Sequence, residues 1–131
     1  MIDEKKIYMI PETDEEKLKL SNLYKDVKKF ETILIRRTNL KHYLKFDYLI
    51  IGELNNDYRL SVESKLPNDI HINNSTIKVI YRIDNKYLRE MIKHFTKYSL
   101  LYLYFSLEKQ LPIFIVTDKG ERGVIAYMTV S

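Results

Sequence analysis

The most constraining feature of this 131-residue chain is the order of its apolar segments from Thr76 to Ser131. An extended β-branched run comes first, a segment with helical spacing of apolar residues follows, and three short apolar runs complete the stretch. Polar breaks, including the glycine-bearing loop Asp118–Gly123, separate the last runs. The pattern predicts a β-α-β-β-β unit with segments Thr76–Ile83, Asp84–Lys97, Ser99–Ser106, Leu111–Thr117 and Gly123–Val130.

An earlier stretch, from Lys5 to Ser64, has the same order of segments. Its elements are predicted as strand Lys5–Pro11, helix Asp14–Lys29, strand Glu31–Arg37, strand-like runs within Leu40–Leu54 and strand Tyr58–Glu63. The chain is therefore interpreted as one α+β domain of duplicated β-α-β-β-β units. Half 1 covers residues 1–66, a loose Pro- and Asn-bearing connector covers 65–75, and half 2 covers 76–131.

Both predicted helices have clear start signals. Thr13-Asp-Glu-Glu16 forms a capping box, which explains this acidic cluster better than a metal site does, and Asp84 suits an N-cap. In each helix the apolar residues share one face and lysines occupy the opposite one. We expect the two helices to lie side by side on one face of an antiparallel sheet, with both basic faces pointing the same way.

Composition favours a soluble, intracellular globular protein. Hydrophobic residues make up 45% and charged residues 31%, and no apolar run approaches the roughly 20 residues that span a bilayer. The N-terminus carries acids among its lysines and does not resemble a secretory signal. The net charge of +4 suits nucleic-acid binding, but a solvated lysine-rich surface would give the same figure.

The sequence shows no motif for catalysis, a cofactor or a metal. There are no cysteines, and His42, His71 and His94 are far apart without ligand-like spacing. The three glycines do not form a phosphate-binding loop, and Gly120 and Gly123 suit a turn. We expect a protein that is not an enzyme.

The layout from Ile77 to Val130 resembles one domain of the DNA sliding clamps of the proliferating cell nuclear antigen family. Gly52-Glu53-Leu54, a polar turn and Tyr58-Arg-Leu-Ser61 are similar to a stretch of that family's second domain. The family joins such domains edge to edge into rings that encircle DNA with a basic helical inner wall. The short, lysine- and isoleucine-rich chain suits a viral or archaeal source.

The resemblance implies a non-catalytic processivity factor that contacts double-stranded DNA through phosphates. The implied DNA-binding residues are Lys17, Lys25, Lys28, Lys29, Lys86, Arg89, Lys93 and Lys97. The family's rings contain six domains and this chain has one, so a ring would need six copies. The last strand, Val124–Val130, would then pair with a neighbour's strand near Tyr48–Ile51.

The chain departs from the family at its C-terminus, where the Ala-Pro-containing tail that helps to form a pocket for client peptides is absent. Pro112, Met128 and Val130 fall near the equivalent positions and are the candidate partner-peptide pocket. Peptides of client proteins would be the occupants of such a pocket, whereas polymerase or a host clamp would be the partner of an adaptor that binds by its sheet edges.

Two other functions remain open from the residues alone. The first is a small adaptor or clamp mimic that binds a replication protein by its sheet edges, without DNA. The second is a binder of single-stranded nucleic acid, in which Tyr98, Tyr102 and Tyr104 stack on bases. Tyrosines at strand positions are also common in ordinary packing, so these three carry both readings.

Overall fold

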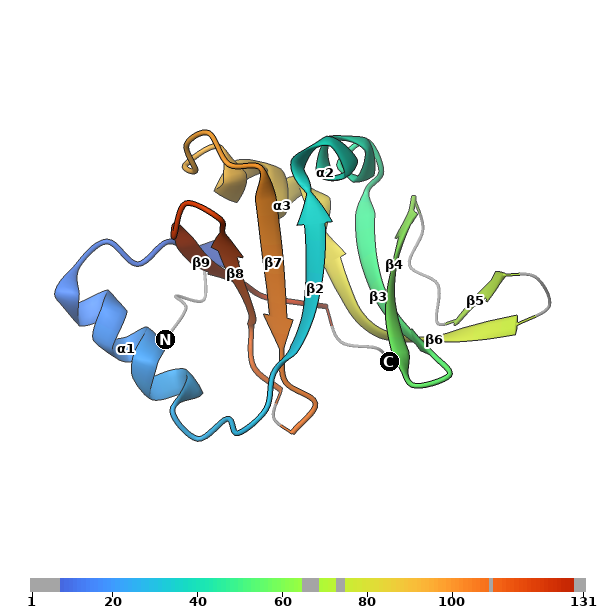
Figure 1. Cartoon of the computed structure of the whole chain (residues 1–131), viewed down its shortest axis with the longest axis horizontal. Helices are drawn as coiled ribbons and strands as arrows, with labels where there is room; N and C mark the ends of the chain where they lie inside the picture. Colours follow the sequence, from blue (N-terminus) through green and yellow to red (C-terminus); the bar gives the residue numbers. More distant parts are fainter. Residues whose placement is uncertain (1–7, 65–68, 73–74, 109, 129–131) are drawn as a thin grey trace.

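A computed structural model describes residues 8–64, 69–72, 75–108 and 110–128 (Figure 1). Its helices are α1 (Asp14–Tyr24), α2 (Arg37–Tyr43) and α3 (Asn85–Ile92). Its strands are β1 (Tyr8–Met9), β2 (Glu31–Arg36), β3 (Tyr48–Leu54), β4 (Asp57–Glu63), β5 (Asp69–Ile72), β6 (Ser75–Asp84), β7 (Leu100–Phe105), β8 (Ile113–Thr117) and β9 (Arg122–Ile125). The fold is α+β, as the sequence predicts.

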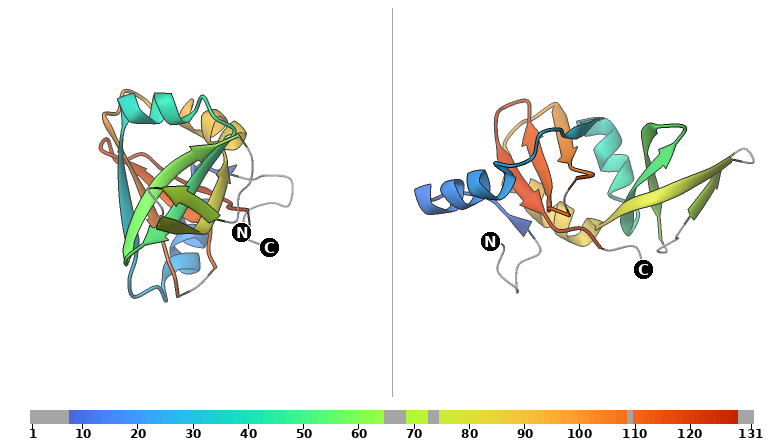
Figure 2. Two further views of the ribbon diagram at one scale, coloured as in Figure 1. Left: turned by 90° about the vertical axis from the view of Figure 1, so that its right-hand side faces the viewer. Right: turned by 90° about the horizontal axis from the view of Figure 1, so that it is seen from below.

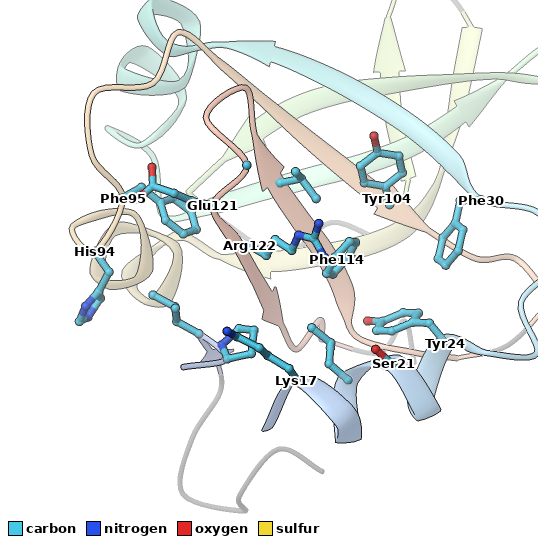
Figure 3. Close-up of a pocket in the computed structure, with 15 residues that line it drawn as sticks. Lys17, Ser21, Tyr24, Phe30, His94, Phe95, Tyr104, Phe114, Glu121 and Arg122 are labelled. Carbon is cyan, nitrogen blue, oxygen red and sulfur yellow. The ribbon is translucent and has the colours of Figure 1, made fainter. Parts of the chain in front are cut away.

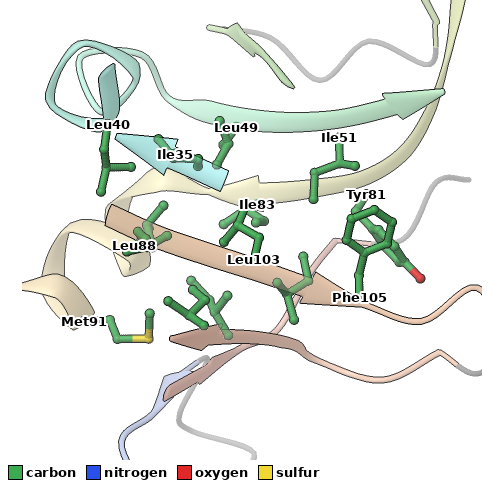
Figure 4. Packing of buried hydrophobic residues seen from close by; sticks show 14 of the residues in the cluster. Ile35, Leu40, Leu49, Ile51, Tyr81, Ile83, Leu88, Met91, Leu103 and Phe105 are labelled. Carbon is green, nitrogen blue, oxygen red and sulfur yellow. The ribbon is translucent and has the colours of Figure 1, made fainter. Parts of the chain in front are cut away.

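The strands form two antiparallel sheets. The five-stranded sheet has the order β1-β9-β8-β7-β2, and the four-stranded sheet has the order β4-β3-β6-β5. A core of aliphatic side chains lies between the two sheets and below α2 and α3 (Figure 4). Leu49, Ile83, Leu103 and Ile113 are fully buried there. Burial alternates along β7 and β8 because every second residue faces this core, whereas β3 is buried on both faces from Leu49 to Gly52.

The two halves of the chain are interleaved. Half 1 supplies β1 and β2 to the five-stranded sheet and β3 and β4 to the other; half 2 supplies β6 to the four-stranded sheet and β7, β8 and β9 to the five-stranded one. The first strand of each half therefore pairs with a strand of the other half. The strand orders are not equivalent, because β1 lies beside β9 whereas β6 lies beside β3.

Half 2 has the predicted order of elements, β6-α3-β7-β8-β9, but half 1 contains an extra helix, α2. The prediction that the segment from Leu40 begins as a strand was wrong at this point. The bond from the Arg37 amide to the Ser99 carbonyl, at 2.9 Å, is the last in register with the β2–β7 ladder, and Leu40 is buried as the anchor of the helix that follows. The short β5, paired with β6, lies within the predicted connector.

Two predicted helices are shorter than expected. The capping box at Thr13 is present, with the Glu16 amide donating to the Thr13 hydroxyl at 3.1 Å, but α1 ends at Tyr24 rather than at Lys29. Helix α3 starts after the Asp84 cap, as predicted, and ends at Ile92 rather than at Lys97. A single turn follows each helix, so the helical spacing of apolar residues continues in the sequence past the last helical hydrogen bond. This is why both predicted helices are too long.

The helices α1 and α3 do not lie side by side, which corrects the expected pair of aligned basic helices (Figures 1 and 2). Helix α1 joins β1 to β2, the two edges of the five-stranded sheet, so its connection crosses the outer face of that sheet. Helix α3 joins β6 to β7 and thus links the two sheets. The different connections place the helices at different sites.

Candidate functional site

The neighbour of α3 is α2, and buried Asn85 joins the two helices. The Asn85 amide Nδ2 donates to the carbonyls of Tyr43 at 3.1 Å and Phe46 at 2.9 Å, and its backbone N–H donates to Asp47 at 2.9 Å. These carbonyls lie at the end of α2 or just after it, where backbone carbonyls have no N–H donor within the helix. The start of α3 is therefore fixed against the end of α2.

Arg89 makes a second link between these helices. Its Nη1 donates to the Leu44 carbonyl at 2.6 Å. Leu44 is the C-cap of α2, so the guanidinium lies at the negative end of that helix dipole. Arg89 was predicted to contact DNA, and the structure gives it a role in helix packing.

The surface around α2 and α3 carries exposed lysines. Asp84 caps α3 through a bond from the Lys86 amide at 2.9 Å, so its charge serves the helix start. We call this surface the α2–α3 end and define it by Lys41, Lys45, Lys86, Lys93 and Lys97. None of these lysines has an ion-pair partner among the described residues.

The structure divides the predicted DNA-binding residues into two separate groups. Lys86, Arg89, Lys93 and Lys97 lie at the α2–α3 end, on α3 or just after it. Lys17 and Lys25 lie on α1 and its C-cap, and Lys28 and Lys29 in the loop beyond it, with Lys29 3.3 Å from Glu31. The eight residues thus do not form one surface.

Lys41 and Lys45 were missed because their segment was interpreted as strand. Their spacing of four residues, which also separates Arg37 from Lys41, matches one helical face, with Leu40 and Leu44 between them. That signal was present in the sequence. It was overlooked because Thr38-Asn39 was taken as a break after β2.

Two of the three residues of the candidate peptide pocket, Pro112 and Met128, lie in the described part of the chain and have backbone contacts of their own. The Pro112 carbonyl accepts from the Tyr24 hydroxyl and so belongs to the α1 side of the molecule. The Met128 amide donates to the Arg82 carbonyl of β6 at 2.7 Å, which attaches Met128 to the other sheet. Val130 lies outside the described residues.

The strands expected to join neighbouring copies are interior strands. β3 lies between β4 and β6, and in the predicted last strand Val124 and Ile125 of β9 lie between β1 and β8, so these residues already have pairing partners on both sides. The prediction of pairing between the last strand and the strand at Tyr48–Ile51 was therefore wrong. The edges of the described sheets are β1, β2, β4 and β5.

A second surface feature is a cavity of about 870 Å³ between α1 and the outer face of the five-stranded sheet (Figure 3). We call it the aromatic groove. The lining residues used below are Lys17, Tyr24, Phe30, Tyr104, Phe114 and Arg122. The Tyr24 hydroxyl donates to the Pro112 carbonyl, and burial raises the pKa of Tyr24 well above its usual range.

The aromatic rings of the groove form a continuous array. Tyr24 contacts Phe30 and Phe114 with ring centroids 5.7 and 5.6 Å apart, and Tyr104 lies 6.2 Å from Phe30 and 6.1 Å from Phe114. Tyr102 extends the array beyond the groove, stacked on Tyr104 at 6.3 Å with an interplanar angle of 26°. Tyr98, by contrast, is buried and lies under the Arg37 guanidinium.

Two cations stand on opposite walls of the groove. Lys17 belongs to α1 and Arg122 to β9, and both are exposed without an ion pair among the described residues. Glu121 also lines the groove, but its carboxylate accepts from the Thr96 amide and hydroxyl at 2.9–3.2 Å. Lys17 is exposed and Leu20 is buried, as predicted for the two faces of α1, but Lys17 also lines the groove beside the sheet, which the sequence did not predict.

Other chemistry is not visible in the described part of the chain. No group of three His, Asp or Glu side chains there is arranged to hold a metal ion. His42 packs against Tyr43 and Phe46, and His94 lies near Tyr8, which are ordinary ring contacts. No described helix is both long and apolar enough to cross a membrane.

Comparison with known proteins adds no family. Set against protein families, curated proteins and solved structures, the chain shows no significant match to any of them.

Proposed function

We propose that this protein is a non-catalytic DNA-binding protein that contacts duplex phosphates through the lysines of the α2–α3 end. The observation that carries the proposal is a set of exposed lysines that lie on α2 and α3 or just after them, where the two helices are bonded to each other, with no ion pairs among the described residues. Phosphate contacts need positive charge at fixed positions and do not need base reading.

The rigidity of this end favours a binding surface over a merely solvated one. Asn85 and Arg89 hold α2 and α3 together with three side-chain bonds of 3.1 Å or less. Binding would therefore not have to order the two helices next to which these lysines lie. Glu90 is the acidic residue on the exposed side of α3 and reduces the local positive charge.

The sliding-clamp role implied by the resemblance is the specific form of this proposal. In that role the α2–α3 end faces DNA in a ring, and α1 is not part of the inner wall. Copies would have to join through an edge such as β2 or β4, because β9 and β3 are interior. Light scattering on the purified protein tests this form: a strict monomer at high concentration excludes the ring but leaves phosphate binding by a monomer.

The adaptor is a second candidate, supported by the free edge of β4. Among the described strands this seven-residue strand pairs with β3 alone, so its other side can accept an added strand. Charged residues Asp57, Arg59 and Glu63 lie along it, a composition that discourages unspecific pairing. In the hairpin register the Leu60 backbone N–H points to the open side of β4. Recovery of a replication protein with the wild-type chain, lost in Leu60→Pro, would favour this candidate.

Salt-dependent binding to duplex DNA tests the main proposal. The double variant Lys41→Gln/Lys93→Gln removes two phosphate contacts, so the slope of log K against log salt should become shallower by about 1.8, at about 0.9 for each contact. Fluorescence anisotropy with a labelled duplex measures this slope.

Lys25→Gln/Lys28→Gln is the matched control, because it removes the same charge from the α1 side. It should leave the slope nearly unchanged. Equal effects of the two double variants would indicate attraction by net charge alone, and an unchanged slope in both would contradict the proposal.

A further inference from the structure

We propose that the aromatic groove is a second nucleic-acid site, which takes a single strand by stacking its bases on tyrosine and phenylalanine rings and holding its phosphates at Lys17 and Arg122. This site is separate from the α2–α3 end and does not depend on duplex binding there. The groove volume of about 870 Å³ lies within the ~300–1,000 Å³ of ordinary ligand sites.

The outer face of the five-stranded sheet is unusual in its side chains. Tyr102 and Tyr104 alternate with core residues along β7, so both project outward, and both are only half-buried. In register with Tyr102, Leu34 of β2 is 50% exposed. Helix α1 covers one part of this face and leaves an open apolar strip from Phe114 across to Leu34, of the kind that marks a binding surface.

The ring geometry favours planar ligands. Tyr102 and Tyr104 are nearly parallel, at 26°, and offset along the strand. Successive bases of a single strand can stack on such a platform, and each base–aromatic contact is worth about 1–3 kcal/mol. A duplex offers no free base faces, because its bases are already stacked on one another.

The charges match a phosphate backbone. Lys17 and Arg122 reach the groove from facing walls, as Figure 3 shows. Glu121 is held by the Thr96 amide and hydroxyl, so its charge is directed to the protein rather than into the groove. An acidic peptide would use the same cations but would leave the stacked tyrosine platform unexplained.

A fluorescent label at Ser21 reports on the groove directly. Ser21 is exposed and lines the groove, and the chain has no cysteine, so Ser21→Cys gives a single labelling site. Adding a short oligothymidylate should change the label's fluorescence in a saturable way. The same label at Ser64→Cys, at the exposed end of β4, should not respond.

Two variants separate charge from stacking. Lys17→Glu/Arg122→Glu alters exposed residues and should weaken oligothymidylate binding at least tenfold. Tyr102→Leu/Tyr104→Leu should weaken this binding by a similar factor. Thermal unfolding of both variants checks that they fold. Lys93→Glu/Lys97→Glu, at the α2–α3 end, should reduce duplex binding and retain the signal from the groove.

Three results would overturn the inference. The first is the absence of a saturable response at Ser21→Cys, and the second is equal binding of oligothymidylate by the charge-reversed and wild-type proteins. The third is a glutamate-tyrosine peptide that binds the groove more tightly than oligothymidylate does and displaces it. Loss of duplex binding alone would contradict the proposed function but not the proposal for the groove, so the two can fail separately.

Discussion

The two faces of the five-stranded sheet are built from the same strands but differ in what covers them. The inner face presents Leu101, Leu103 and Phe105 of β7 to the core, and these side chains are at most 1% exposed. The outer face presents Tyr102 and Tyr104, which α1 covers only in part. The comparison teaches that one alternating strand can serve stability on one side and leave a binding surface on the other.

The connections explain this difference. On the inner side, α3 arrives directly from β6, packs through Leu88 and Met91, and closes the core together with the four-stranded sheet. On the outer side, α1 has one buried residue, Leu20, and its apolar residues are spread around the helix. A weakly amphipathic helix cannot seal a whole sheet face.

The largest expected effect comes from breaking the inner face. Leu103→Ala should lower the free energy of unfolding by about 2–5 kcal/mol, because it leaves a cavity in a close-packed core. Tyr102→Leu, one residue away on the outer face, should change it by less than about 1 kcal/mol. Urea unfolding measures both, and equal losses would show that the outer face is packed as tightly as the core.

A middle effect concerns the attachment of α1. Tyr24→Phe removes the bond to the Pro112 carbonyl and should cost about 0.5–1.5 kcal/mol, with faster hydrogen exchange confined to α1. Tyr102→Phe is the control, since its hydroxyl has no partner among the described residues.

The same variant has a signature at alkaline pH. Burial raises the pKa of Tyr24, so the folded state resists its ionisation, and this stability is lost as pH rises above the ordinary tyrosine pKa of about 10. The wild-type protein should therefore lose stability more steeply than Tyr24→Phe above that pH. Parallel losses would mean that Tyr24 is not held against the sheet.

The smallest effect on stability is expected at Asp118, which follows β8 and bonds to the start of β7. The Asp118 carboxylate accepts from the amides of Ser99 at 2.9 Å and Leu100 at 3.1 Å, and these bonds lower its pKa. The resulting stability is full above the unfolded pKa of about 3.9 and is lost as pH falls through the lower folded value. Asp118→Asn should reduce this acid dependence slightly.

Much of the local structure could be predicted from the sequence. The capping box at Thr13, the cap at Asp84 and the order of elements in half 2 follow from side-chain hydrogen bonding and from periods of 2 and 3.6 residues. The tyrosines of β7 allowed two interpretations, packing or base stacking; Tyr102 and Tyr104 lie half-buried on the outer face, and base stacking stays a prediction.

The candidate site was less predictable. Lys41 and Lys45 required knowing that α2 is a helix, and Lys17 required knowing which side of α1 meets the sheet. Both depend on packing by single anchors, Leu40 and Leu20, which carry no distinctive pattern of their own. Charge on a predicted helix therefore did not reveal which direction that charge faces.

By itself, the sequence determined the secondary-structure class of most segments and the mixed α+β composition, because these depend on neighbours along the chain. Only the tertiary structure decided that β3 and β9 are interior strands, that α2 rather than α1 accompanies α3, and that a groove opens beneath α1. Strand order and helix position depend on contacts between distant residues, and many arrangements bury the same alternating pattern equally well.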